Sequence, residues 1–174
     1  GPPLTASFQE FHHLTAEQAD MALGYYRERF STIGMFENAP YDGVDSLLQR
    51  LRDEGYHLMI ATSKPEEFTI QILKHFNLTH YFTFVCGNTL EETRPTKESV
   101  IRCIMDRFPS IRRENTLMIG DRKYDIIGAH SCGLRGIGVL YGYGDEAELT
   151  QCGADAMAAD LMQLERLIHT LLPC

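Results

Sequence analysis

The sequence contains no apolar run long enough to span a membrane and does not open with a charged-then-apolar signal pattern. It also has no repeats, no low-complexity stretch and no C-x-x-C pair, so the usual signature of a zinc or redox site is missing. Its five cysteines are odd in number and widely spaced, which indicates reduced thiols and a cytoplasmic location. Cys86 and Cys103 stand in apolar patterns, and we expect them to pack in the core.

The bulk composition indicates one folded α/β core with an appendage, because 174 residues with 44% hydrophobic content are ordinary for a globular chain. The net charge of −8 disfavours nucleic acid as a partner. A small phosphorylated molecule remains compatible with this charge, because a local site can be basic. The composition therefore disfavours a nucleic acid and a membrane as partners, and it carries no signal for an oligomeric state.

The pattern of apolar and polar residues changes after the first 40 residues, and we place a domain boundary near Tyr41. The opening Gly1-Pro2-Pro3 predicts an extended start, because proline is excluded from a helix interior. Thr15 followed by Gln18 has the pattern of a capping box and predicts a helix that runs to about Arg29.

From Tyr41 onward, short apolar runs alternate with amphipathic segments. The apolar runs predict strands over 57–62, 82–86, 116–119 and 136–141, with a weaker one over 154–158. The amphipathic segments predict helices over 44–52, 65–76, 96–108, 124–132 and 161–172. Such alternation predicts a parallel sheet with right-handed crossovers, whose ligands bind beyond the carboxyl ends of the strands.

Five polar residues stand at these strand ends and helix starts: Thr62, Ser63, Lys97, Asp121 and Asp125. The two aspartates lie four residues apart and so share one face of a helix start, where their oxygens suit Mg²⁺. A threonine hydroxyl and a lysine ammonium could then bind a phosphoryl group.

Each of these residues also has an ordinary structural explanation. A Gly-Asp pair before a helix is often only a turn and a cap, and Asp125 could simply favour the helix dipole. Thr62 and Lys97, each taken alone, are more typical of structural and solvated positions. It is the order and the spacing of the set that favour a site.

The same residues carry a family resemblance. Ala61-Thr62-Ser63-Lys64-Pro65, Arg94-x-x-Lys97 and Gly120-Asp121-Arg122-x-x-Asp125 resemble the second, third and fourth motifs of haloacid dehalogenase-type hydrolases, and the nearest likeness is to the phosphoglycolate phosphatase-like members. The resemblance implies a Rossmann-like parallel sheet flanked by helices over 41–174, with a partial helical cap over 1–40. It also implies a Mg²⁺-dependent phosphatase of small phosphorylated metabolites that works through an aspartyl-phosphate. Thr62, Ser63 and Lys97 would then contact the phosphate, with Thr62 and Lys97 catalytic, and Asp121 and Asp125 would hold the metal.

One family motif is missing from this sequence. The nucleophile and the general acid belong to an Asp-x-Asp-x-Thr motif on the family's first strand, which lies between the strands ending here at Thr62 and Ile119. Asp42 and Asp45 have the wrong spacing to replace it. We therefore expect a gap between these two strands, a sequence that is incomplete at its start, and no activity for this chain alone.

Two other functions compete with this interpretation. A nucleotide-binding module is suggested by the G-x-G-x-x-A pattern that starts at Gly142, although Asp145 and Glu146 would repel a pyrophosphate and the helix before Gly153 is short. A non-catalytic binding or assembly module would explain the missing nucleophile. It would not explain why Lys97, Asp121 and Asp125 occur together.

Overall fold

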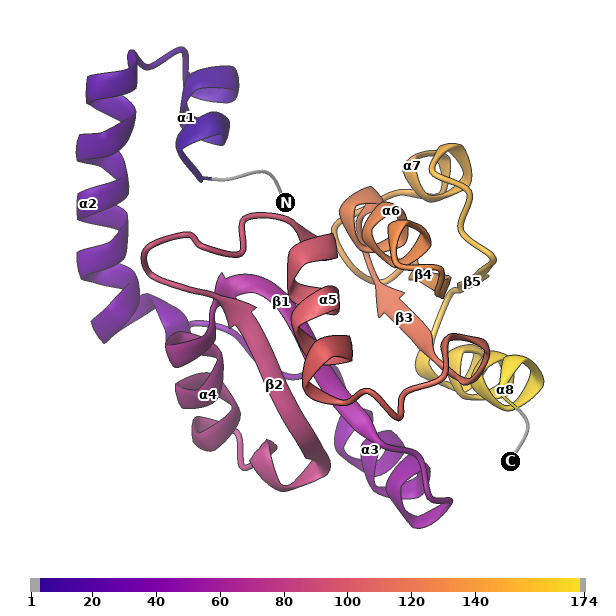
Figure 1. Ribbon diagram of the computed structural model, residues 1–174. Helices are drawn as coiled ribbons and strands as arrows, with labels where there is room; N and C mark the ends of the chain where they lie inside the picture. The colour runs from indigo at the N-terminus through magenta and orange to yellow at the C-terminus, as the bar shows by residue number, and fades with distance from the viewer. Residues whose placement is uncertain (1–3, 173–174) are drawn as a thin grey trace.

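The computed structural model describes residues 4–172 and has the predicted α/β architecture (Figure 1). Its strands are β1 (Leu58–Pro65), β2 (Phe82–Asn88), β3 (Leu117–Gly120), β4 (Arg135–Val139) and β5 (Ala156–Ala158). Its α-helices are α1 (Leu4–His12), α2 (Ala16–Thr32), α3 (Val44–Asp53), α4 (Glu66–His75), α5 (Lys97–Arg107), α6 (Lys123–Ser131), α7 (Glu146–Gln151) and α8 (Leu161–Leu171). Short 3₁₀ turns lie at Gly34–Phe36, Thr79–Tyr81 and Arg113–Asn115.

The strands form two separate parallel sheets. One sheet pairs β1 with β2, and the other has the order β3-β4-β5. In the first sheet Ala61 lies opposite Cys86, and in the second Ile119 lies opposite Ile137. Among the described residues β1 and β3 do not pair with each other, so each is an edge strand of its own sheet.

Helices cover both faces of the two sheets. On one face α3 and α8 pack on the second sheet through a buried cluster made of Leu47, Leu51, Ile137, Val139, Ala158, Leu164 and Ile168. On the other face α5 and α6 form two smaller clusters made of Ile101, Ala129, Cys132 and Leu134, and of Cys86, Val100 and Ile104. Cys86 is therefore buried as predicted, and Cys103 is a half-buried neighbour of the last cluster.

The helices α1 and α2 form a hairpin that stands to one side of the sheets (Figure 1). The start of α2 has the predicted capping box, with Thr15 and Gln18 bonded reciprocally. Helix α1 was not predicted; the extended start expected for Gly1-Pro2-Pro3 lies outside the described residues. The hairpin contacts the sheet region through Arg27, which forms a 3.0 Å ion pair with Glu92, and through Phe30, whose ring lies 5.6 Å from that of Phe68.

Most element boundaries fall within three residues of the prediction. Helix α3 ends before Gly55, whose φ of +91° favours glycine and stops the helix as expected. Strand β4 ends at Val139, two residues short of the predicted Tyr141, whose ring instead packs 5.1 Å from that of Tyr41. No described helix is both long enough and apolar enough to cross a membrane.

Candidate active site

Lys97 lies at the centre of the candidate site. It is the first residue of α5, and Thr96 caps this helix through the backbone N–H of Ser99. The Lys97 Nζ lies 2.9 Å from the Asp125 Oδ1 and donates a 2.9 Å hydrogen bond to the Ala61 carbonyl oxygen. Only 10% of the Lys97 side chain and 9% of the Asp125 side chain are exposed. This lysine therefore joins the end of β1 to the start of α6, and the predicted motifs meet at one edge.

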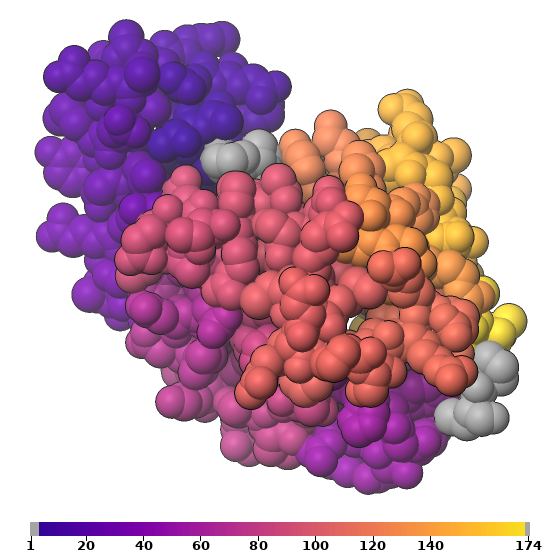
Figure 2. Space-filling view, viewed as in Figure 1, coloured from indigo at the N-terminus to yellow at the C-terminus, as the bar shows by residue number. Residues whose placement is uncertain are grey.

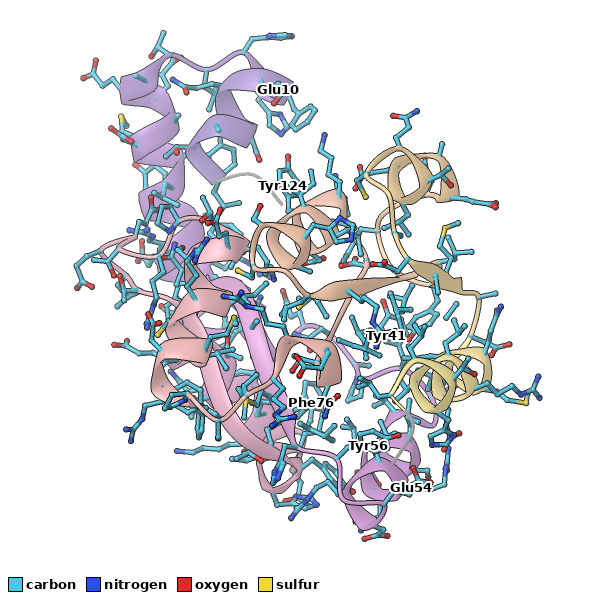
Figure 3. The ribbon with its side chains drawn as sticks, turned by 45° about the vertical axis from the view of Figure 1, so that its right-hand side comes forward. Glu10, Tyr41, Glu54, Tyr56, Phe76 and Tyr124 are labelled. Atoms are coloured by element: carbon cyan, nitrogen blue, oxygen red, sulfur yellow. The ribbon has the colours of Figure 1, made fainter. Side chains whose placement is uncertain are left out.

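Asp121 follows the last residue of β3, and Asp125 lies in the first turn of α6, the helix that also carries Tyr124, which is labelled in Figure 3. The Asp125 Oδ2 accepts a 3.1 Å hydrogen bond from the backbone N–H of Arg122, which caps the helix. The Asp121 Oδ2 accepts a 2.8 Å hydrogen bond from the backbone N–H of Tyr143. Both carboxylates are thus oriented by backbone donors.

Three glycines make room for these carboxylates. A Cβ placed at Gly120 would overlap the Asp125 side chain, and one at Gly142 would overlap the Asp121 side chain. A Cβ at Gly144 would overlap the Asp121 backbone oxygen, which accepts a 2.9 Å hydrogen bond from the Gly144 N–H. The turn at 142–144 therefore packs closely around Asp121 and donates two backbone hydrogen bonds to it. From the sequence this turn was considered only as the start of a G-x-G-x-x-A pattern, which did not indicate a contact with Asp121.

The hydrogen bonds of the 142–144 turn argue against a nucleotide-binding module. Two N–H groups of the turn already donate to Asp121, and the Asp145 side chain caps α7 through the N–H of Glu148. Helix α7 has only six residues. Several of the backbone donors that a pyrophosphate would need are thus engaged within the chain.

The residues at the end of β1 lie next to Lys97. The Thr62 Oγ1 accepts a 3.1 Å hydrogen bond from the Lys64 N–H, which leaves its hydroxyl proton free to donate elsewhere. Ser63 is half-buried in the same strand. The Lys64 ammonium lies 4.5 Å from the centre of the Phe30 ring of α2, and burial lowers the pKa of Lys64. A second cation is thus held where the helical hairpin meets the sheet.

The two arginines of the motifs point elsewhere. Arg94 lies 3.2 Å from the Cys103 Sγ and 3.4 Å from Glu66, and its buried Nε has no partner among the described residues. Arg122 forms a 2.8 Å ion pair with Glu148, and this hydrogen bond raises the pKa of Arg122 and lowers that of Glu148. Both therefore support the local fold around the site.

The carboxylates fit a Mg²⁺ site of the kind that uses few protein ligands. Within residues 4–172 no three His, Cys, Asp or Glu side chains gather closely enough to hold a metal by themselves. Magnesium commonly takes one or two carboxylates and completes its shell with waters and a substrate phosphate. Asp121, which accepts a hydrogen bond from the Tyr143 N–H, suits this role better than Asp125, which is paired with the Lys97 ammonium.

Comparison with known proteins matches this geometry to one family. A family profile described as Haloacid dehalogenase-like hydrolase matches residues 1–139. A 5'-nucleotidase from Pseudomonas aeruginosa is 38% identical over 170 residues, which covers 98% of this chain and 76% of the relative. The crystal structure of a predicted phosphatase from Clostridium acetobutylicum superposes with a TM-score of 0.92 at 45% identity, covering 98% of this chain and 78% of that one.

A relative with a different name shares the same region. The tyrosine-protein kinase PtkA from Mycobacterium tuberculosis is 32% identical over 144 residues, and the match spans 83% of this chain but only 48% of the kinase. Further relatives carry the name phosphoglycolate phosphatase, in agreement with the resemblance of the motifs. The profile match, the relatives and the motif geometry agree, and the chain belongs to the haloacid dehalogenase-like hydrolases.

Proposed function

We propose that this chain forms the larger part of a Mg²⁺-dependent phosphatase that hydrolyses small phosphate monoesters through an aspartyl-phosphate. The supporting observation is the Lys97 ammonium, which joins β1 to the start of α6 and lies against an oriented carboxylate. The proposal includes that the chain alone has no activity, because its sequence holds no Asp-x-Asp-x-Thr segment.

The role proposed for each residue follows from the negative charge of the substrate and the nucleophile. A phosphoryl group that approaches an aspartate nucleophile brings negative charges together, so the site must supply cations. Lys97 supplies one positive charge at a fixed position, and Thr62 and Ser63 donate hydrogen bonds to phosphoryl oxygens. Asp121, with Asp125 beside it, would hold Mg²⁺, which neutralises phosphate charge when bound.

The helical hairpin is proposed to be part of a substrate-selecting cap over residues 1–40, with the catalytic core over 41–174. Lys64 and Phe30 lie at the contact between the two parts. A half-buried cation beside an aromatic ring suits a substrate that carries both a phosphate and an apolar or aromatic portion. Nucleoside monophosphates are one such class, in keeping with the name of the Pseudomonas relative.

The proposal is tested with the chain and with a fusion that carries a first strand with Asp-x-Asp-x-Thr ahead of Gly1. We expect p-nitrophenyl phosphate turnover with Mg²⁺ from the fusion and none from the chain. In the fusion, Lys97→Ala should lower kcat by about 10²–10³-fold, as removal of a preorganised charge partner does. Thr62→Val should lower kcat less, because a neutral hydrogen bond is weaker.

The controls distinguish a catalytic Lys97 from a lysine that is merely exposed to solvent. Lys74 lies in the last turn of α4, away from the site, and Lys74→Ala should leave kcat unchanged. A Lys97→Ala fusion that keeps within about threefold of the parent rate would contradict the assignment. Turnover by the chain alone that disappears in Asp121→Asn would contradict its proposed inactivity.

A non-catalytic binding or assembly module is the second candidate. It is favoured by the Lys97–Asp125 ion pair, which already satisfies both charges without a substrate. A fusion that folds and binds inorganic phosphate, yet turns over no phosphate ester, would favour this candidate.

A further inference from the structure

Two cysteines lie against each other where α5 packs on β2. Cys86 belongs to β2 and Cys103 to α5, and Cys103 packs on the buried cluster that contains Cys86. Cys86 is completely buried, whereas Cys103 is only half-buried. Burial, and after it a hydrogen bond with Cys103, raise the pKa of Cys86 to about 12. Cys86 therefore keeps its proton at neutral pH, beside a sulfur atom that is open to solvent.

A guanidinium group lies beside the half-buried thiol. Arg94 donates a 3.2 Å hydrogen bond from Nη1 to the Cys103 Sγ and a 3.4 Å hydrogen bond from Nη2 to Glu66. The buried Arg94 Nε has no partner among the described residues. Core packing explains two apolar cysteines, but it does not explain a partly buried cation directed at one of the sulfur atoms. A positive charge beside a cysteine is typical of reactive thiols, because the charge stabilises the thiolate.

The surroundings of the two thiols give them different roles. Cys103 has the guanidinium beside it and is open to solvent, so a small oxidant reaches it first. Cys86 is closed to solvent, but it lies against the Cys103 sulfur and is placed to attack that sulfur once it is oxidised. The other described cysteines, Cys132 and Cys152, donate to backbone carbonyl oxygens instead.

We propose that Cys86 and Cys103 form a reversible redox site, which hydroperoxides oxidise to a disulfide, and that this oxidation loosens the loop between β2 and α5. First the Cys103 thiolate attacks a peroxide oxygen: the S–O bond forms, the O–O bond breaks, and the departing hydroxide takes up the thiol proton. The Cys86 sulfur then attacks the resulting sulfenic acid, so that the S–S bond forms and a second water leaves. Two thiols and one hydrogen peroxide thus give one disulfide and two waters.

Arg94 connects this chemistry to the loop over residues 88–96. Its backbone N–H donates to the Asn88 Oδ1, and its side chain joins Cys103 to Glu66, so Arg94 holds the loop against α4 and α5. A disulfide sulfur carries no charge and is a weak acceptor. Oxidation therefore leaves the Arg94 side chain with Glu66 as its one strong acceptor among the described residues, and we expect the loop to become more mobile.

The same loop contacts the helical hairpin. Its Glu92 forms the 3.0 Å ion pair with Arg27 of α2. In Figure 2 the pink residues between β2 and α5 lie at the surface below the indigo hairpin. A looser loop should therefore also weaken this contact between the hairpin and the sheet region. The inference concerns thiol chemistry and does not depend on the proposed function.

The test uses the full chain, hydrogen peroxide and peptide mapping without reductant. We expect a disulfide between Cys86 and Cys103, its reversal by dithiothreitol, and faster hydrogen exchange over 89–96 in the oxidised chain. Cys86→Ala should stop the reaction at a sulfenic acid on Cys103, which dimedone traps. Cys103→Ala should leave Cys86 reduced, because Cys86 is buried. The control Cys152→Ala removes another half-buried thiol and should change none of these results.

Arginine variants test the role of the guanidinium. Arg94→Met keeps most of the apolar stem but removes the charge, and it should slow the oxidation of Cys103 at least about tenfold, the factor expected for a lost charge-assisted hydrogen bond. Arg94→Lys keeps the charge and should recover part of the rate. The matched control is Arg102→Met, because Arg102 lies on the same helix but pairs with Glu98. This control should leave the rate unchanged.

Phenylarsine oxide, which bridges two adjacent thiols, tests the contact in the unmodified chain. It should block Cys86 and Cys103 together, and reaction with only one of them would overturn the inference. Three other results would also overturn it: peroxide oxidation that does not join these two cysteines, unchanged exchange over 89–96 after oxidation, or an Arg94→Met rate within about threefold of the parent. None of these measurements uses phosphatase activity, so failure of the proposed function would leave this inference standing.

Discussion

The ion pair between Lys97 and Asp125 gives a prediction about stability that is independent of catalysis. Lys97→Met keeps the length and apolar stem of the side chain but removes its charge. The substitution removes two interactions of the ammonium group: the 2.9 Å contact to Asp125 and the 2.9 Å hydrogen bond to the Ala61 carbonyl oxygen. Asp125, with 9% of its side chain exposed, would remain buried with the Arg122 N–H as its one remaining donor among the described residues.

The magnitude follows from this burial. At 2.9 Å and an effective dielectric constant of about 20, the gross attraction is about 6 kcal/mol, and part of it is offset by desolvation. Removal of one partner of a buried pair costs about 3–5 kcal/mol, because the other charge is left uncompensated. We expect Lys97→Met to lose about 3 kcal/mol, at the lower end, because Asp125 retains one backbone donor.

The assay is urea unfolding of the chain and of three variants: Lys97→Met, Asp125→Asn and the double variant. The double variant should lose less free energy of unfolding than the two single variants lose together. The difference should be at least about 1 kcal/mol, because the double variant leaves no unpaired buried charge. A loss below about 1 kcal/mol for Lys97→Met, or simple additivity, would refute the argument and place the pair in a solvated setting.

Three further predictions concern other parts of the fold. Gly142→Ala should displace Asp121 and weaken Mg²⁺ binding in calorimetry, while Gly24→Ala, which meets no neighbour, should leave it unchanged. Burial raises the pKa of Cys86 to about 12, so iodoacetamide at about pH 8 should label Cys86 only after unfolding, and labelling in the folded chain would contradict its burial. The hydrogen bond from Arg50 lowers the pKa of Glu165, so that carboxylate stabilises the fold above its ordinary pKa and stops doing so in acid. Glu165→Gln should therefore lower the Tm at about pH 7, and the difference should shrink as the pH falls through the lowered pKa of Glu165; a constant difference would refute the linkage.

The sequence predicted most of the order of elements because its signals are local. Alternating apolar runs, the Thr15 capping box and the glycine after α3 each act within a few residues. Helix α1 was missed although Leu4, Phe8 and Phe11 have helical spacing. The two preceding prolines were given too much weight, since proline is compatible with the first turn of a helix.

The partners within the site could not be predicted in the same way. Lys97 and Asp125 are 28 positions apart, and Asp121 and Gly142 are 21 apart, so their contacts depend on how helices and turns pack across the sheet. The motifs indicated which residues belong together. They did not indicate that Lys97 pairs with Asp125, or that the 142–144 turn encloses Asp121.

The division of the strands into two sheets has a consequence for how the chain folds. Residues 58–88 hold one complete sheet and residues 117–158 hold the other, so every strand pairing is made between segments close in sequence. These pairings are parallel and each needs a helical crossover, but each closes a shorter loop than a pairing between the two sheets would. Helix α5, which lies between the two segments in the chain and packs on β1, β2 and α6, then brings the halves together. Each half can therefore become structured as its own cooperative unit before the two dock.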